Sequence, residues 1–134
     1  MGGHTDLRTL LSNMRPDLRD GEFVFCTGSP ERFNRLRVEP IGWFREPEGV
    51  SLIVERSVAE REGLSCDFVC RLIVLSVHSS LYAVGFSAAV TAKLAAAGIS
   101  ANLVAGYYHD YLFVPAADAG AAMAELLELM NDAS

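Results

Sequence analysis

The sequence predicts an α+β protein made of two similar halves, each an antiparallel sheet with helices packed on one face. Short β-branched and aromatic runs alternate with stretches of helical periodicity. Each half has a strand, a connection, a two-stranded hairpin and a helix, and the hairpins begin about sixty residues apart, at Ile41 and Ile99. Of the 134 residues, 51% are hydrophobic and 21% charged, which is enough apolar material for a packed core.

The first half begins with a helix and a strand. Apolar side chains three and four positions apart predict a short amphipathic helix from Thr5 to Met14, which Pro16 ends. Aromatic and β-branched residues predict a strand over Glu22–Thr27. The charged stretch Ser29–Glu39 is expected to hold a helical turn.

A hairpin and a short helix follow. The strands Ile41–Glu46 and Val50–Arg56 are joined by a Pro-Glu-Gly turn. Ser57 is expected to cap the helix, Glu60 to complete a capping box, and Gly63 to end the helix.

The second half follows a linking segment, Ser65–Cys70. It starts with the nearly all-apolar run Arg71–Val77, which is typical of a central strand. A helix is predicted over Leu81–Ala97, with Gly98 as its C-terminal cap.

Two strands, Ile99–Ala105 and Tyr111–Val114, and a final helix begun by Asp118 complete the pattern. The helical crossover makes the first two strands of this half parallel, and the third is antiparallel to both. The result is a ferredoxin-like, split βαβ sheet. We divide the chain into an N-terminal lobe, residues 1–66, and a C-terminal domain, residues 67–134.

The helix over Leu81–Ala97 is apolar most of the way round, with Ser87, Thr91 and Lys93 as its few polar members. A helix on the sheet of a lone monomer should present a polar face to water. Either the first half of the chain or a second chain covers this surface. The second alternative predicts a homo-oligomer, most simply a homodimer.

Charge and composition exclude several function classes. The net charge of −6 argues against nucleic acid and anionic lipid as partners. No apolar run approaches the roughly 20 residues that span a bilayer, and the first residues do not resemble a secretory signal. An odd number of cysteines, Cys26, Cys66 and Cys70, is expected to remain reduced in the cytoplasm.

The junction before the long helix is the first candidate site. The first N–H groups of a helix lack internal partners and lie at the positive end of its dipole, so a carboxylate binds there readily. A serine hydroxyl could cap the helix or contact the anion, and a glycine would allow close approach. The alternative is simple capping and packing. The candidates here are His78, Ser79, Ser80, Leu81, Val84 and Gly85.

The turn of the second hairpin is the other candidate site. Aromatic faces and a carboxylate suit the ammonium group of an amino acid. An asparagine on the preceding strand could both donate to and accept from a ligand. The alternative is an ordinary turn with tyrosines packed on the sheet. The candidates are Asn102, Gly106, Tyr107, Tyr108, His109 and Asp110.

Motifs for catalysis are weak. The run from Gly85 to Ala89 lacks the second glycine of a nucleophile elbow, and there is no glycine-rich phosphate loop. A metal site at His78 and His109 lacks a third ligand. We therefore expect neither catalytic residues nor a cofactor.

The run VHSSLYAVGFSAAVTAKLAAAGISANLVAGYYHDYLFVP resembles the core of a bacterial family of ACT-domain proteins, and the ACT modules of the CASTOR arginine sensors. The run FREPEGVSLIVE is similar to the smaller lobe of the same bacterial family. The resemblance implies βαββαβ units that pair side by side, with a ligand at the junction between units. The second unit lacks a final strand of its own, so Glu22–Thr27 or a partner chain would have to fill that place.

Three functions fit these observations. The first is a non-catalytic regulatory protein that binds a small molecule, most simply an amino acid. The second is an interaction or assembly module without a ligand. The third is a small enzyme on the same fold, because a fold does not determine a function.

Overall fold

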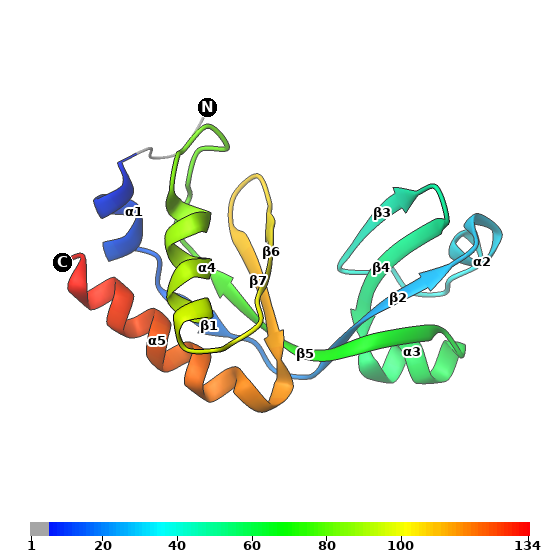
Figure 1. Cartoon of the computed structure of the whole chain (residues 1–134). Coiled ribbons are helices and arrows are strands. Elements are labelled where there is room, and N and C mark those ends of the chain that lie inside the picture. Colours follow the sequence, from blue (N-terminus) through cyan, green and yellow to red (C-terminus); the bar gives the residue numbers. More distant parts are fainter. Residues whose placement is uncertain (1–5) are drawn as a thin grey trace. The chain divides into compact units, whose positions relative to one another are not determined.

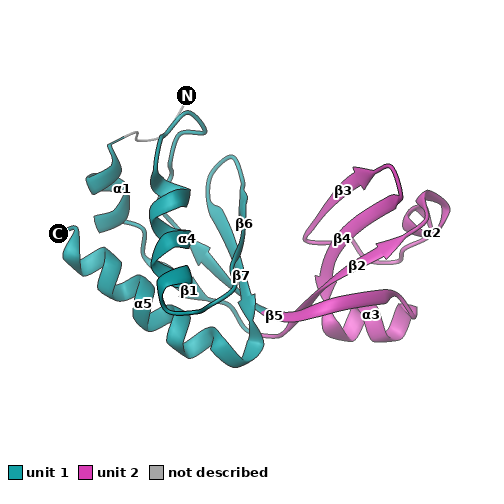
Figure 2. Ribbon diagram, in the orientation of Figure 1, with its two compact units in different colours: residues 1–20, 71–134 teal, residues 21–70 magenta. Residues whose placement is uncertain are grey.

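The computed structural model describes residues 6–134 (Figure 1). The chain forms two compact units (Figure 2): unit 1 contains residues 1–20 and 71–134, and unit 2 contains residues 21–70. The division predicted from the sequence, residues 1–66 and 67–134, refers to repeated units of a family rather than to these compact units. It stays a prediction. Thr5, where we expected the first helix to begin, lies outside the described residues.

Unit 2 is a four-stranded antiparallel sheet with two short helices. The strand β4 lies between β3 and β2, and β2 also pairs with the first part of β5, residues 65–70. The helix α2 connects β2 to β3, and α3 connects β4 to β5. The elements are β2 (Phe23–Gly28), α2 (Pro30–Asn34), β3 (Gly42–Glu46), β4 (Gly49–Glu55), α3 (Arg56–Glu62) and β5 (Ser65–Leu75).

Unit 2 therefore confirms the predicted order of a strand, a connection, a two-stranded hairpin and a helix, and it adds a closing strand. Its core is built from alternate residues of two neighbouring strands, because side chains in a strand point to opposite faces in turn. The helix α3 adds one buried alanine to the same cluster. The buried residues are Val24, Cys26, Leu52, Val54 and Ala59.

Unit 1 has the same strand arrangement with longer helices. The second part of β5 lies between β1 and β7, and β6 pairs antiparallel with β7 at the edge. This order confirms the predicted split βαβ sheet. The additional elements are α1 (Leu7–Ser12), β1 (Pro16–Leu18), α4 (Phe86–Ala96), β6 (Asn102–Ala105), β7 (Asp110–Pro115), the 3₁₀ turn η1 (Ala116–Asp118) and α5 (Ala119–Asp132).

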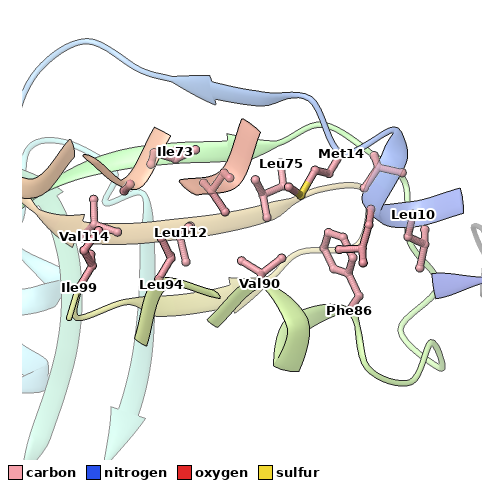
Figure 3. Close-up of a cluster of buried hydrophobic side chains, with 14 residues drawn as sticks. Leu10, Met14, Ile73, Leu75, Phe86, Val90, Leu94, Ile99, Leu112 and Val114 are labelled. Atoms are coloured by element: carbon pink, nitrogen blue, oxygen red, sulfur yellow. The ribbon is translucent and has the colours of Figure 1, made fainter. Parts of the chain in front are cut away.

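The helices of unit 1 share one core with β5 and β7 (Figure 3). The side chains of Phe86, Val90 and Leu94 follow a four-residue spacing and form the buried face of α4. The opposite face of α4 carries exposed alanines, so its apolar outer surface is formed by small side chains. Lys93 anchors α4 to α5 through Glu128, with a Nζ–Oε1 distance of 2.8 Å.

The missing strand of the second half comes from the beginning of the chain. Residues 16–18 pair antiparallel with residues 73–75, so β1 occupies the fourth position in the sheet of unit 1. Our expectation that Glu22–Thr27 fills this place is wrong, because β2 pairs with β4 and with residues 65–70 in unit 2.

Three local expectations are also wrong. The presumed linker Ser65–Cys70 is a strand, because β2 supplies hydrogen-bonding partners along it. Ser57 lies inside α3, and Glu55 is the N-cap without a side-chain hydrogen bond, so no capping box forms. The expectation that all three cysteines are reduced is also wrong, because Cys26 and Cys66 form a disulfide and only Cys70 is free.

Candidate functional site

The two segments selected from the sequence meet in unit 1. The Oγ of Ser79 donates a hydrogen bond to Oδ2 of Asp110 at 3.3 Å. The ring centroid of His78 lies 5.4 Å from that of Tyr108 and 6.2 Å from that of Tyr107. The beginning of the loop after β5 and the turn between β6 and β7 thus form one cluster of polar and aromatic groups.

The hairpin turn positions the two tyrosines. The N–H of Gly106 donates to the carbonyl of His109 at 2.9 Å, which closes the turn. A Cβ at Gly106 would lie 2.9 Å from that carbonyl oxygen, so only glycine fits. The rings of Tyr107 and Tyr108 meet edge to face with centroids 4.9 Å apart, and both remain more than half exposed. They present aromatic surface to solvent.

Asp110 is the one buried charged residue among residues 6–134, with 4% of its surface exposed. Burial raises the pKa of its carboxyl group, while the hydrogen bond from Ser79 and the nearby His109 act in the opposite direction. Nδ1 of His109 is also buried, and within residues 6–134 it has no hydrogen-bond partner. The cluster therefore contains the buried carboxyl group of Asp110, the unsatisfied Nδ1 of His109 and the exposed rings of Tyr107 and Tyr108. It has hydrogen-bonding capacity that the protein itself does not use.

The helix start differs from the expectation. The long helix begins at Phe86 rather than at Leu81, and its N-cap is Gly85 with a φ of 95°. Ser80 stabilises a turn instead, because its Oγ accepts a hydrogen bond from the N–H of Tyr82 at 3.1 Å. His78, Ser79 and Ser80 therefore do not lie at a helix N-terminus, and the helix-dipole argument for them is wrong.

The remaining candidates lie at different places in unit 1. Asn102 begins β6 opposite Phe113, at the far end of that strand from the turn. Leu81 and Val84 are exposed in the loop before α4, by 65% and 85%. A Cβ at Gly85 would lie 3.5 Å from the side chain of Leu7, and the positive φ of Gly85 favours glycine at this position.

Sequence analysis missed two pockets of unit 2. A cavity of about 410 Å³ lies beside α3 and β5, and one of about 240 Å³ lies beside α2 and the β3–β4 hairpin. Recognising Ser65–Cys70 as a strand opposite β2 would have placed Cys66 next to Cys26 and pointed to the larger one. Within the described range 6–134, no helix is long and apolar enough to cross a membrane.

Comparison with known proteins identifies relatives of both halves. Residues 2–71 and residues 67–128 each match a family model described as an ACT domain. A search of curated proteins found no match.

Solved structures show the same fold. A Vibrio cholerae protein of unknown function, described as a possible transport protein, is 46% identical, with a TM-score of 0.83 over 92% of this chain and 95% of that one. An Agrobacterium tumefaciens protein is 14% identical, with a TM-score of 0.65 over 86% and 87% of the two chains. The regulatory subunit of aspartate kinase from Thermus thermophilus is 10% identical, with a TM-score of 0.61 over 85% and 95%. The last two likenesses concern the fold alone.

Proposed function

Because the chain belongs to the ACT-domain family, we propose that it is a non-catalytic regulatory protein that binds an amino acid in unit 1. The observation that carries this proposal is the hydrogen bond between Ser79 and Asp110, which joins the two candidate segments. The carboxylate of Asp110 and the rings of Tyr107 and Tyr108 suit the ammonium group of the ligand. The imidazole of His109 is a donor for its carboxylate, while the hydroxyl of Ser79 holds Asp110 in place.

We further propose that the protein works in the cytoplasm as a homodimer. The exposed alanine face of α4 and the exposed Leu81 and Val84 support association with a second copy. An ACT unit of that copy would complete the ligand site. Binding would then regulate by shifting the population of arrangements of the two copies.

A thermal-shift screen of the twenty amino acids at millimolar concentration tests the proposal. A ligand that binds only the folded state at 100 times its Kd stabilises it by about 2.7 kcal/mol, so at least one amino acid should raise the melting temperature. No shift with any of the twenty would contradict amino-acid binding.

Matched aromatic variants locate the site. Tyr108→Ala should abolish the shift, because Tyr108 contacts both His78 and Tyr107. Phe44→Ala should retain it, because Phe44 is 72% exposed and belongs to unit 2. Equal shifts in the two variants would place the ligand elsewhere.

An assembly module without a ligand is the second candidate function. The exposure of Leu81, Tyr82 and Val84 in one loop favours it, because large apolar side chains gathered on a surface mark interaction sites. Light scattering with and without the amino acids distinguishes the two functions. A constant oligomeric state, together with no thermal shift, favours assembly alone.

A further inference from the structure

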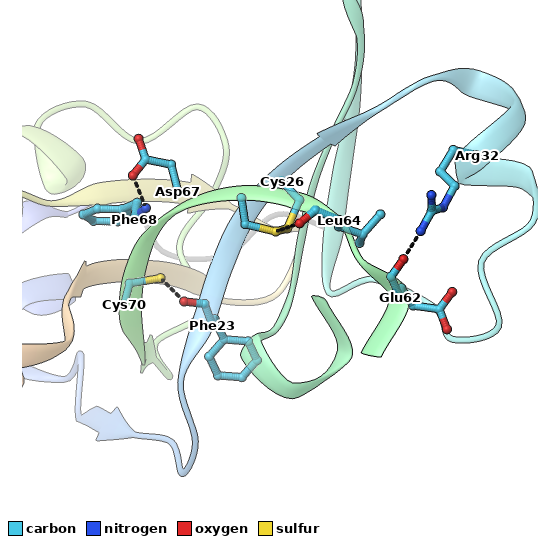
Figure 4. Close-up of a disulfide and its surroundings, with 9 residues drawn as sticks. Phe23, Cys26, Arg32, Glu62, Leu64, Asp67, Phe68 and Cys70 are labelled. Carbon is cyan, nitrogen blue, oxygen red and sulfur yellow. Dashed lines mark hydrogen bonds between the residues drawn. A yellow bond between two sulfur atoms is a disulfide. The ribbon is translucent and has the colours of Figure 1, made fainter. Parts of the chain in front are cut away.

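The two sulfurs of the disulfide in unit 2 lie in different surroundings (Figure 4). Cys26 and Cys66 are directly opposite each other in the antiparallel pairing of β2 with β5. Cys26 is 3% exposed and belongs to the core of unit 2. Cys66 is exposed and lines the cavity of about 410 Å³. A reagent from solvent therefore reaches the side of the bond formed by Cys66.

The same cavity carries charges of both signs. Its charged lining residues are the guanidinium of Arg56 and the carboxylates of Glu60 and Asp67. Phe68 and Val69 add apolar surface. The guanidinium of Arg56 is paired with Glu22 at 2.8 Å and with Glu60 at 3.7 Å, and its side chain remains about half exposed. This lining is complementary to a small molecule that has both carboxylate and ammonium groups.

The strand pairing beside the disulfide is irregular. The register between β2 and β5 shifts between Phe23 and Phe25, and Phe68 has a φ of 60°, which is unfavourable for a bulky residue. Asp67 supports this bend, because its Oδ1 accepts a hydrogen bond from the N–H of Phe68 at 2.7 Å. Backbone outliers of this kind gather at functional sites and switch segments.

We propose that Cys66 is a site of thiol–disulfide exchange with a low-molecular-weight thiol that carries carboxylate and ammonium groups. The thiolate of this molecule attacks Sγ of Cys66 and forms a mixed disulfide, while the bond between Cys66 and Cys26 breaks. Cys26 leaves as a thiolate and takes up the proton that the incoming thiol lost. The incoming sulfur is oxidised and Cys26 is reduced, so no other electron donor is needed.

The reverse step restores the disulfide. Cys26 remains opposite Cys66 in the strand register, so its thiolate can attack Sγ of Cys66 and expel the small thiol. All of these residues belong to unit 2, so the inference does not depend on the amino-acid site proposed for unit 1. Disulfides in cytoplasmic proteins are usually transient or redox-sensing, so the cytoplasmic location proposed above would fit a bond that opens and re-forms.

Cys70 is a natural internal control. It is fully buried, and its thiol donates a hydrogen bond to the carbonyl of Phe23 at 3.3 Å. Burial raises the pKa of Cys70 to about 12, so almost none of it is thiolate at neutral pH. Exchange should therefore leave this residue unmodified.

Single-cysteine substitutions in the full chain test which sulfur reacts. Cys26→Ala, treated with oxidised glutathione, should gain one glutathione, and peptide mapping should find it on Cys66. Cys66→Ala leaves Cys26 in the core, so its modification should be at least about tenfold slower. Equal rates in the two variants, or no adduct on Cys26→Ala, would overturn the proposal.

The wild-type protein gives a second readout in case a variant fails to fold. Treatment with reduced glutathione, followed by acid quenching and mass mapping, should trap the mixed disulfide on Cys66 alone. An adduct on Cys26 or Cys70, or an intact disulfide at every glutathione concentration, would contradict the exchange.

The class of thiol is tested on Cys26→Ala with two disulfides, oxidised glutathione and the uncharged bis(2-hydroxyethyl) disulfide. Rates are normalised to those of a free cysteine peptide. Glutathione should be preferred by several-fold, and Arg56→Gln should remove most of that preference, because the guanidinium would no longer attract a carboxylate. Equal normalised rates for the two disulfides would contradict a preference for thiols with charged groups, but they would leave Cys66 as the site of exchange.

Discussion

Asp110 is a carboxyl group whose environment opposes its ionisation. Burial raises the pKa of Asp110 above its ordinary value of 3.8, so the folded protein binds this proton more tightly than the unfolded chain. The stability that the protonated group contributes is fully present below pH 3.8 and is lost as the pH rises through the raised pKa.

Asp110→Asn should remove this pH dependence, because asparagine does not ionise and its Oδ1 can still accept from Ser79. The free energy of unfolding of the variant minus that of wild type should grow as the pH rises from 3.8 through the raised pKa of Asp110, by no more than about 1.4 kcal/mol per pH unit, and then stay constant. Urea unfolding across this range measures the difference. Asp20→Asn, at an exposed position, is the control. A difference that does not change with pH would contradict the prediction.

Two glycines of unit 1 should respond in opposite directions to the same substitution. Gly106→Ala should destabilise the protein by about 1–3 kcal/mol, because the new Cβ would lie 2.9 Å from a backbone oxygen and 3.0 Å from the ring of Tyr111. Gly120→Ala should stabilise α5 by about 0.5–1 kcal/mol, because nothing lies within 4 Å of its Cβ position. Denaturant unfolding compares them, and similar effects would disprove the close contact at the hairpin turn.

At the scale of elements, α1 and β1 matter because they complete unit 1 from outside the 67–134 region. Leu10→Ala should cost about 2–5 kcal/mol, because this fully buried side chain belongs to the core of unit 1. Leu7→Ala should cost less than about 1 kcal/mol, because Leu7 is 36% exposed on the same helix. In Leu10→Ala, the backbone amides of β5 and β7 should exchange hydrogen faster than in wild type. Equal costs for the two variants would mean that α1 does not pack in this core.

The disulfide should stabilise unit 2 by restricting its unfolded state. Cys26 and Cys66 are 40 residues apart, and closing a loop of this length is worth about 4 kcal/mol in the chain-entropy model. Treatment with a dithiol reductant should therefore lower the melting temperature of wild type. The double variant Cys26→Ala/Cys66→Ala should not respond to the reductant. A response in the double variant would assign the effect to something other than this bond.

The elements that could be predicted from the sequence are those with local signals. Pro47-Glu48-Gly49 predicted the β3–β4 hairpin, and Gly63 predicted the end of α3. The strand β1 could not be predicted, because three residues carry no periodicity and their pairing partner lies far along the chain. The start of α4 was missed because the apolar run continues through Leu81, whereas the backbone of Gly85 interrupts it.

The candidate site shows the same division between local and long-range information. Residue chemistry was sufficient to select Ser79 and Asp110, and the structure brings them within hydrogen-bonding distance. The proposed reason for the serines was wrong, because helix boundaries depend on backbone geometry that apolar periodicity does not encode. The disulfide was missed because the pairing of β2 with residues 65–70 is a tertiary feature.

At the scale of the whole molecule, the aromatic residues report separately on the two units. The single tryptophan, Trp43, lies in unit 2, whereas all four tyrosines, at positions 82, 107, 108 and 111, lie in unit 1. After reduction of the disulfide, the Trp43 fluorescence transition should move to lower denaturant concentration than the tyrosine absorbance transition. Coincident transitions in the reduced protein would show that the units lose structure together.

The origin of β1 has a consequence for how the protein is made. Unit 2 is a contiguous stretch, residues 21–70, whereas unit 1 joins residues 1–20 to residues 71–134. During translation, residues 21–70 are all synthesised before residues 71–134, so unit 2 is free to fold before unit 1. The core residues of α1 that precede unit 2 can be buried only after the β6–β7 hairpin and α5 have also been synthesised. The side chains of Leu10 and Met14 therefore stay exposed to solvent while residues 21–134 are being synthesised.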